Sequence, residues 1–378
     1  MIRHRLFSTL ALSLSSLLLA SQIAVAQQPA TAFGTEAQRA ASTGLPHFRQ
    51  FVHIANEVNI FGNFTVLDHP ELNGHPEAIV YATVNSTPDG RSGIYNEHPI
   101  GVWYDEGKWT VFTQDLAPMP VGAAFTVRVG GGFRHQVTAS NSLGIATTID
   151  NPLTNNDPNA VLLVTPLWDT LDSPVYVNHH IGVLYSPAVE KWTIALTELD
   201  RMPEGASFNV LVGKGLVHTA GEQNTIGNRT LIDSPLTNGR PEAKLLVTYN
   251  VSATSNPDAP VNDHPIGVFY DGLRWSIANQ DQVDIANGAA FNVFVANPPT
   301  ITNAFFSGKK LVVEVEGVAG EGAVLVNGAL PPIARLDLAN QKIIVSRMSK
   351  AIPVGATATI EVQDEDGVRS DAFSFTRQ

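Results

Sequence analysis

The sequence contains no cysteine, so no disulfide can form and apolar cores alone must stabilise the folded chain. For the same reason, no cysteine is available to carry a lipid. Hydrophobic residues make up 44% of the chain, which is enough for ordinary buried cores and argues against global disorder.

Basic residues are in short supply. The chain has 23 Lys and Arg against 35 Asp and Glu, and its formal net charge is −12. Nucleic-acid binding needs clustered Lys and Arg to contact the phosphates, so we expect no nucleic-acid partner. The chain also lacks a long basic run, which argues against an anionic membrane surface as partner.

Long apolar runs are missing except at the start of the chain. Arg3 and Arg5 precede the apolar residues 6–20, and Ala24 and Ala26 form a small-x-small cleavage site. The run is short for a membrane span, and no other stretch is long enough. We therefore predict a signal peptide over residues 1–26, no transmembrane segment after its removal, and a bacterial protein that is secreted, periplasmic or at the cell surface.

One motif is present three times. Residues 98–104 read His-Pro-Ile-Gly-Val-Trp-Tyr and are followed by a tryptophan, and related segments occur at 179–185 and 264–270. A second histidine marks the same three copies at His53, His135 and His218, which are 82 and 83 residues apart (135 − 53 and 218 − 135). Agreement at many further fixed offsets indicates three homologous units.

Apolar residues inside each unit alternate with a period of two, as in residues 291–295. The apolar run over 160–164 predicts a central strand covered on both faces. The expected fold is all-β, with three tandem repeats of ~82 residues, each a small β-sandwich or barrel, and a C-terminal Ig-like β-sandwich. The predicted boundaries are 1–26 for the signal peptide, 27–50 for a linker, 51–132, 133–215 and 216–297 for the repeats, and 298–378 for the Ig-like domain.

Very few residues connect one repeat to the next. The connections fall at 130–132 and 213–215, and both are rich in glycine. Such short connections predict abutting, bead-like modules rather than modules on flexible tethers.

The repeat carries several specific motifs: His-Pro-Ile-Gly-Val-x-Tyr, the Trp-x-Ile that follows it, Met-Pro-x-Gly-Ala-Ala-Phe at 119–125, and an Asp-x-Pro-x-x-Asn-Gly segment that begins at Asp68. On these motifs, residues 51–295 resemble a repeated domain of unknown function from secreted bacterial proteins. The resemblance implies no activity and no site residues.

The last part of the chain has a different pattern. Its motifs lie at 299–301, 326–328, 352–355 and 366–370, and its glycine-rich middle, 316–320, is weak. On these motifs, residues 298–378 resemble an IPT/TIG-type immunoglobulin-like domain. Such domains space or present other modules outside the cell, so the resemblance implies a supporting role.

The repeated histidines are the sharpest candidates for a metal site. Two histidines per repeat, completed by an acid such as Asp68 or Asp115, would suit Zn²⁺. Against this, His53 has the strand parity of Phe51 and lies on an apolar face, where a hydrogen-bonded structural histidine is common. The six candidate ligands are His53, His98, His135, His179, His218 and His264.

Oxygen ligands around Asp68, Asn73 and Asp115 would instead suit Ca²⁺. The dense Asp/Asn/Gly loop of a known Ca²⁺ motif is missing, and turn capping explains Asp68 and Asn73 together. We therefore expect no cofactor, with Ca²⁺ or Zn²⁺ as the alternatives.

Hairpin tryptophans are candidates for stacking on a sugar ring. One tryptophan is common to all repeats, and we interpret it as a core residue at Trp109, Trp192 and Trp275. Trp103 has the opposite parity to the apolar residues around it, and its equivalents are Leu184 and Phe269. Trp103 and Trp168 are therefore the predicted ligand-binding residues.

The chain has no Gly-x-Ser-x-Gly, His-Glu-x-x-His or phosphate-loop motif. Its conspicuous polar residues occur three times, whereas an enzyme normally needs one asymmetric site. We predict an exported, non-enzymatic repeat protein that serves binding, adhesion or structure, with a carbohydrate or an envelope or extracellular protein as partner. The alternative is a metal-assisted hydrolase that uses the repeated histidines on an envelope or extracellular polymer.

Overall fold

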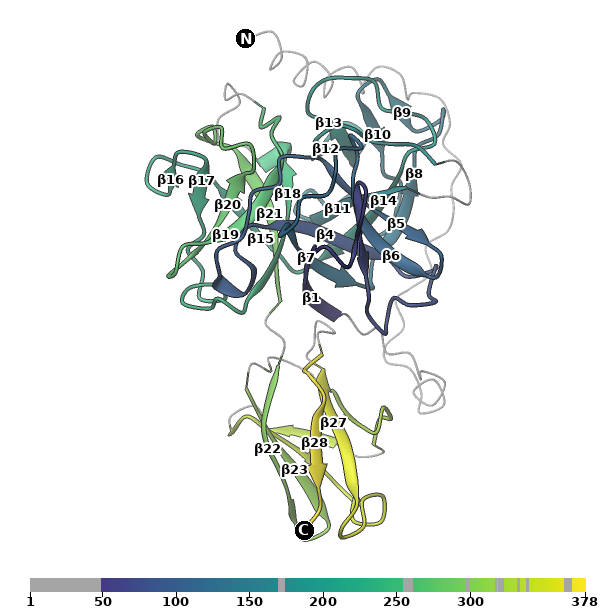
Figure 1. Ribbon diagram of the computed structural model, residues 1–378, viewed down its shortest axis with the longest axis vertical. Helices are drawn as coiled ribbons and strands as arrows, with labels where there is room; N and C mark the ends of the chain where they lie inside the picture. The colour runs from purple at the N-terminus through teal and green to yellow at the C-terminus, as the bar shows by residue number, and fades with distance from the viewer. Residues whose placement is uncertain are drawn as a thin grey trace. The chain divides into compact units, whose positions relative to one another are not determined.

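The computed structural model describes residues 49–378, apart from 169–173, 254–260, 297–298, 317, 319–322, 332–333, 338–339 and 364–368. The predicted signal peptide and nearly all of the predicted linker lie outside these described residues. The described chain divides into two compact units, 50–295 and 296–378 (Figure 1). Among the described residues, regular structure consists of strands and two short 3-10 turns, η1 (Pro88–Gly90) and η2 (Val251–Ala253), which confirms the all-β prediction. No described segment forms a helix with the length and apolarity that a membrane span requires.

Each repeat of the first unit is a two-layer sandwich with three strands in one layer and four in the other. In repeat 1 the layers are β1 (Arg49–Ile54), β7 (Ala124–Val129) and β4 (Val80–Asn85), and β2 (Ile60–Phe61), β3 (Phe64–Leu67), β6 (Lys108–Thr113) and β5 (Ile100–Asp105). Apolar side chains from both layers enclose the core of the repeat. The predicted hairpin is β5 with β6, in which Tyr104 pairs with Trp109 and their rings meet edge to face at 5.6 Å.

The other two repeats follow the same order. In repeat 2 the strands are β8 (Phe133–Gln136), β14 (Ser207–Gly213) and β11 (Val161–Trp168), and β9 (Ser142–Leu143), β10 (Ala146–Thr148), β13 (Lys191–Leu196) and β12 (Ile181–Ser186). In repeat 3 they are β15 (Leu216–Thr219), β21 (Ala290–Ala296) and β18 (Lys244–Asn250), and β16 (Thr225–Ile226), β17 (Arg229–Leu231), β20 (Trp275–Asn279) and β19 (Ile266–Tyr270). Each repeat has its own core, and the shared tryptophan is at most 1% exposed in all three, which confirms its core assignment.

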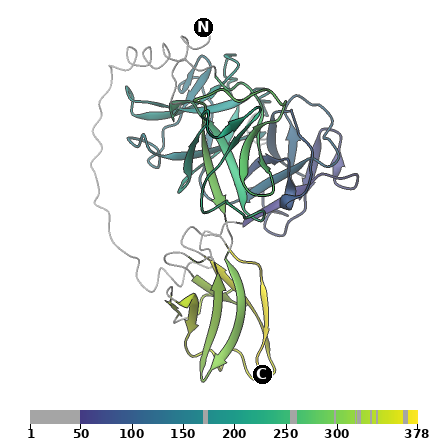
Figure 2. The same ribbon diagram turned by 90° about the vertical axis from the view of Figure 1, so that its left-hand side faces the viewer.

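The layers of different repeats join edge to edge. Parallel pairing links β5 to β11, β12 to β18 and β19 to β4, so each four-stranded layer continues into the three-stranded layer of another repeat. The result is three seven-stranded sheets, which we call sheet 1/2, sheet 2/3 and sheet 3/1 after the repeats that share them (Figure 2). The three repeats therefore form a closed ring. The repeats abut as predicted, but the prediction that they are bead-like is wrong, because each repeat shares one sheet with each of the other two.

The three sheets meet at their central strands, β4, β11 and β18, each of which contacts the other two. We call this meeting line the axis. The side chains facing it form an apolar cluster that includes Tyr81, Leu163, Leu211, Leu246 and Phe294. All six residues of β4 are buried, as expected for a strand covered on both faces.

A ring of hydrogen bonds surrounds the axis. In each of these bonds a threonine hydroxyl accepts from a backbone amide of another repeat, and all three bonds are buried. The hydroxyl and amide pairs are Thr165 with Ala82 at 3.3 Å, Thr248 with Val164 at 2.9 Å, and Thr83 with Val247 at 3.1 Å. Each bond joins two repeats, and the three bonds close the cycle from repeat 1 to 2, 2 to 3 and 3 to 1.

A glycine lies at each parallel junction between repeats, at Gly101, Gly182 and Gly267. A Cβ atom at Gly267 would lie 2.7 Å from the Val84 carbonyl oxygen and 2.6 Å from Gln280 Nε2. We expect Gly267→Ala to lower the free energy of unfolding by about 1–3 kcal/mol in a urea titration, because the added methyl group would overpack the junction. Gly221→Ala is the control, since its Cβ would come no closer than 3.9 Å to any atom. Equal effects of the two substitutions would contradict the prediction.

The second unit is a smaller pair of sheets around its own apolar core. One sheet contains β22 (Thr300–Ser307), β23 (Lys310–Glu316), β26 (Lys342–Val345) and β25 (Ala334–Asp337), and the other contains β24 (Ala323–Val326), β27 (Thr357–Gln363) and β28 (Phe373–Thr376). The Asn327-Gly328 turn that follows β24 has positive φ at both residues. The predicted Asp366-Gly367 turn lies outside the described residues.

Candidate functional site

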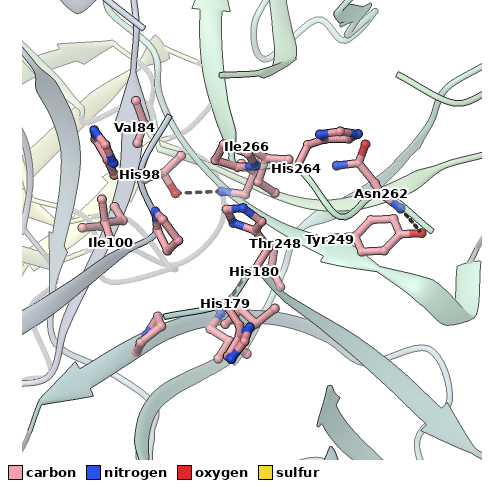
Figure 3. Close-up of a pocket in the computed structure, with 18 residues that line it drawn as sticks. Val84, His98, Ile100, His179, His180, Thr248, Tyr249, Asn262, His264 and Ile266 are labelled. Carbon is pink, nitrogen blue, oxygen red and sulfur yellow. Dashed lines mark hydrogen bonds between the residues drawn. The ribbon is translucent and has the colours of Figure 1, made fainter. Parts of the chain in front are cut away.

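A pocket, which we call the axial pocket, lies beside the threonines whose hydrogen bonds surround the axis. Residues of all three repeats line it (Figure 3). Its apolar wall includes Ile100, Ile181 and Ile266, which are the first residues of β5, β12 and β19. The predicted histidines His98, His179 and His264 come just before these strands, so the fold brings one from each repeat to the same pocket. In Figure 3 His180 lies between these three side chains.

Two of these histidines are held by a carboxylate in the same way. His98 Nδ1 lies 2.6 Å from Asp115 Oδ2, and His264 Nδ1 lies 2.6 Å from Asp281 Oδ2. The other oxygen of Asp115 accepts from the Ala117 amide, so the turn after β6 fixes the carboxylate. A carboxylate that engages Nδ1 directs Nε2 away from it, where it can meet a ligand. In His264 this nitrogen already lies 3.6 Å from Asp263 Oδ1.

Repeat 2 departs from this pattern. His179 lies 3.7 Å from Glu198 and 3.7 Å from Asp200, both longer than the corresponding contacts in the other repeats. His180 occupies the place of Pro99 and Pro265, and its backbone amide donates to Glu198 Oε1 at 2.8 Å. Burial lowers the pKa of His180, and the nearby carboxylates of Glu198, Asp281 and Asp263 oppose this shift.

The second set of histidines has a different role. His135 Nε2 lies 2.8 Å from the Thr147 hydroxyl, which donates its only proton to Asn141 Oδ1 at 3.1 Å. The hydroxyl must therefore accept from Nε2–H, which fixes the neutral tautomer. The same relay occurs in repeat 1 (His53, Thr65 and Asn59) and in repeat 3 (His218, Thr230 and Asn224). In each repeat the relay ties the first strand of one layer to a strand of the other, and burial lowers the pKa of the histidine to about 4.

The six predicted ligands thus form two separate sets. The relay histidines are His53, His135 and His218, and the pocket histidines are His98, His179 and His264. Within the described part of the chain, no three His, Cys, Asp or Glu side chains form a group that could hold a metal ion. Asp68 accepts a hydrogen bond from Asn73 at 2.8 Å and pairs with Lys108 at 2.7 Å, and these bonds lower its pKa. Asp115 is engaged by His98, so the two acids named as further metal ligands both have other partners.

Trp103 and Trp168 are brought together by the junction between repeats 1 and 2. They are register partners on the parallel strands β5 and β11, and their rings meet edge to face at 5.1 Å. Phe64 packs on Trp103 at 5.3 Å and Tyr176 on Trp168 at 5.6 Å, while Phe61 packs on Phe64 at 5.8 Å. We call these five residues the aromatic row of sheet 1/2. The two end residues are exposed, Phe61 by 55% and Tyr176 by 41%.

The two tryptophans of the row share an unusual feature. Each indole Nε1 is buried, and neither has a hydrogen-bond partner among the residues that the structure describes. By contrast, the core indoles of Trp109, Trp192 and Trp275 each donate to a backbone carbonyl oxygen at 2.8–2.9 Å. A buried donor without an acceptor costs about 1–3 kcal/mol, so the row is not optimised for stability alone.

The other two sheets show what the fold itself requires at these positions. In sheet 2/3 the residues equivalent to Phe64, Trp103, Trp168 and Tyr176 are all aliphatic: Ala146, Leu184, Val251 and Val261. In sheet 3/1 the guanidinium of Arg229 lies 4.5 Å above the ring of Phe269, which stacks on Tyr95. The full row occurs once in three equivalent places. Sequence reasoning named its two tryptophans but missed Phe61, Phe64 and Tyr176. Phe64 could have been found as a departure from the repeat pattern, because the other repeats place Ala146 and Arg229 there.

The fold and these sites define a class of protein: a closed β-ring of three interlocked repeats with an axial pocket and one aromatic surface. The domain family described as "Domain of unknown function (DUF7452)" matches residues 21–129, 130–212 and 213–295. These matches cover well over half of the chain, and the chain belongs to this family. A search of curated proteins finds no match.

Proposed function

We propose that the protein is an exported, non-enzymatic binding protein whose aromatic row on sheet 1/2 binds a carbohydrate. The observation that carries the proposal is the single occurrence of the row, with its two unpartnered indole N–H groups, among three equivalent sheets. Residues repeated three times serve the shared fold, whereas a feature present once is free to serve a ligand.

The chemistry of the row suits a sugar. Exposed aromatic rings can cover the apolar C–H face of a pyranose, as Phe61 and Tyr176 would at the two ends of the row. Sugar hydroxyls are acceptors as well as donors, so a hydroxyl that reached an indole N–H after a side-chain rotation would relieve its missing hydrogen bond. A purely apolar ligand would leave that cost in place.

Export is part of the same proposal and is supported by the leader pattern of residues 1–26, with its charged start, apolar run and cleavage site. The second unit fits as a spacer that presents the ring, as its IPT/TIG-like motifs imply. Its two-sheet core agrees with that resemblance and needs no ligand of its own.

The binding site predicts the outcome of a matched pair of substitutions. A glycan array with the whole protein should identify a ligand, and Trp103→Ala should then weaken its binding at least tenfold by calorimetry, because tryptophan anchors dominate binding energy. Phe269→Ala changes the equivalent position of sheet 3/1 and should leave binding unchanged. A blank array, or equal losses from both variants, would count against the proposal.

The axial pocket supports a second candidate function, a metal-assisted hydrolase. Its favouring observation is the contact between a carboxylate and Nδ1 at His98 and His264, the arrangement that orients metal-ligating histidines. Zn²⁺ suits imidazole ligands and would be the metal, and metal analysis of purified protein tests it directly. Bound metal that is lost in a triple variant of His98, His179 and His264 to alanine would favour this function over the first.

A further inference from the structure

The three interfaces between repeats are built alike, whether or not a short connection joins the two repeats. Each consists of a parallel strand junction, one hydrogen bond from a backbone amide to a threonine hydroxyl, and a share of the apolar cluster at the axis. The interface between repeats 3 and 1 has all three elements, although no short connection joins those two repeats. This interface is therefore held by its surfaces and not by a connection of its own.

A single repeat separated from the ring would expose what the interfaces cover. The outer edges of β4 and β5 would lose their partners β19 and β11, and an unpaired strand edge readily pairs with another chain. The axial face would expose apolar groups, because the fully buried Tyr81, Leu163 and Leu246 come from three different repeats and pack in one cluster.

We infer that a single repeat associates with two further copies of the same repeat fold to form a trimeric ring. The chain is then such a trimer with its three subunits covalently linked. The ring closes with three members, so no free junction remains for a fourth. This inference does not depend on carbohydrate binding.

The axis also specifies which copies combine. Repeat 1 places Arg128 where repeats 2 and 3 place Leu211 and Phe294, and Arg128 is only 8% exposed. A ring of three copies of repeat 1 would bring three buried guanidinium groups around one axis, where like charges repel strongly. Copies of repeats 2 and 3 would bring only apolar side chains. Assembly should therefore accept at most one copy of repeat 1.

The test uses the full chain with a protease site inserted after Gly131 and a second one after Lys214, both in the short connections. After cleavage, native mass spectrometry should find one particle that holds all three pieces. The thermal midpoint of the cleaved protein should fall with each tenfold dilution, whereas that of the uncut protein should not, because only a non-covalent assembly responds to concentration.

A second step tests the specificity of the axis. The cleaved mixture is unfolded in urea and refolded, and the new particles are weighed. Particles with three pieces and no more than one copy of repeat 1 support the inference. Separation of the pieces on cleavage, or particles that contain two or three copies of repeat 1, would overturn it. If one insertion prevents folding, the chain cut only at the other connection gives the same readout with two pieces.

Discussion

Between pH 6.5 and pH 4 the free energy of unfolding of the ring of repeats is expected to fall steeply. The pKa values of the relay histidines His53, His135 and His218 are lowered to about 4 by burial, against an ordinary value of 6.5. Below pH 6.5 the unfolded chain binds protons that the folded chain does not, so the free energy of unfolding falls as the pH falls. Each histidine contributes about 1.4 kcal/mol per pH unit over this window, and the three together about 4 kcal/mol per unit.

The structure explains why these histidines resist protonation. The hydroxyl of Thr147 already accepts from Nε2–H of His135, so the neutral ring satisfies its relay without an added proton. His135 and His218 are only 8% exposed, and within the described ranges each ring bonds to a threonine hydroxyl and to no carboxylate that could stabilise a charge. The cost of burying the charged form is therefore not offset.

Urea titrations at several pH values between 4 and 7 measure this dependence. His135→Gln keeps an N–H donor for Thr147 but cannot titrate, so its stability should fall less steeply than that of the wild type, by about 1.4 kcal/mol per pH unit. Carboxylates such as Asp150, whose pKa is lowered by Lys191 and Asn155, are present in both proteins and cancel in the comparison. Identical slopes for the two proteins would show that burial does not control the protonation of His135.

The sequence could predict the strands because their signals are local. Alternating apolar residues and Gly, Pro and Asn turns gave the hairpin of β5 and β6 and its Tyr104–Trp109 pair. Strand parity also placed His53 on an apolar face, where its relay with Thr65 now explains it. These features depend on residues close together in the chain.

The closed ring could not be predicted, because strand periodicity gives no information about which edge pairs with which. The short connection at 130–132 is compatible with two arrangements: separate modules in a row, or a chain that passes from a strand of sheet 3/1 to a strand of sheet 1/2. Trp103 and Trp168 were each identified from the sequence. Their contact was not, since it depends on the parallel register of β5 with β11, two strands of different repeats.

Trp275→Ala should destabilise all three repeats, although it alters the core of only one. The indole is fully buried in the core of repeat 3 and donates to the Arg240 carbonyl oxygen at 2.8 Å. Its removal leaves a large cavity and deletes this hydrogen bond, and we expect a loss of about 3–5 kcal/mol. Because repeat 3 supplies β19 to sheet 3/1 and β18 to sheet 2/3, its unfolding would uncover β4 of repeat 1 and β12 of repeat 2.

Hydrogen exchange followed by mass spectrometry distinguishes this from independent modules. In Trp275→Ala, amides of β4 and β12 should lose protection together with those of β20, in one cooperative transition. Ile343→Ala, which removes a buried side chain from the separate core of the second unit, should leave the exchange of these three strands unchanged. If β20 exchanged rapidly while β4 and β12 kept their wild-type protection, the repeats would be energetically independent. The shared sheets would then not couple the unfolding of one repeat to that of the others.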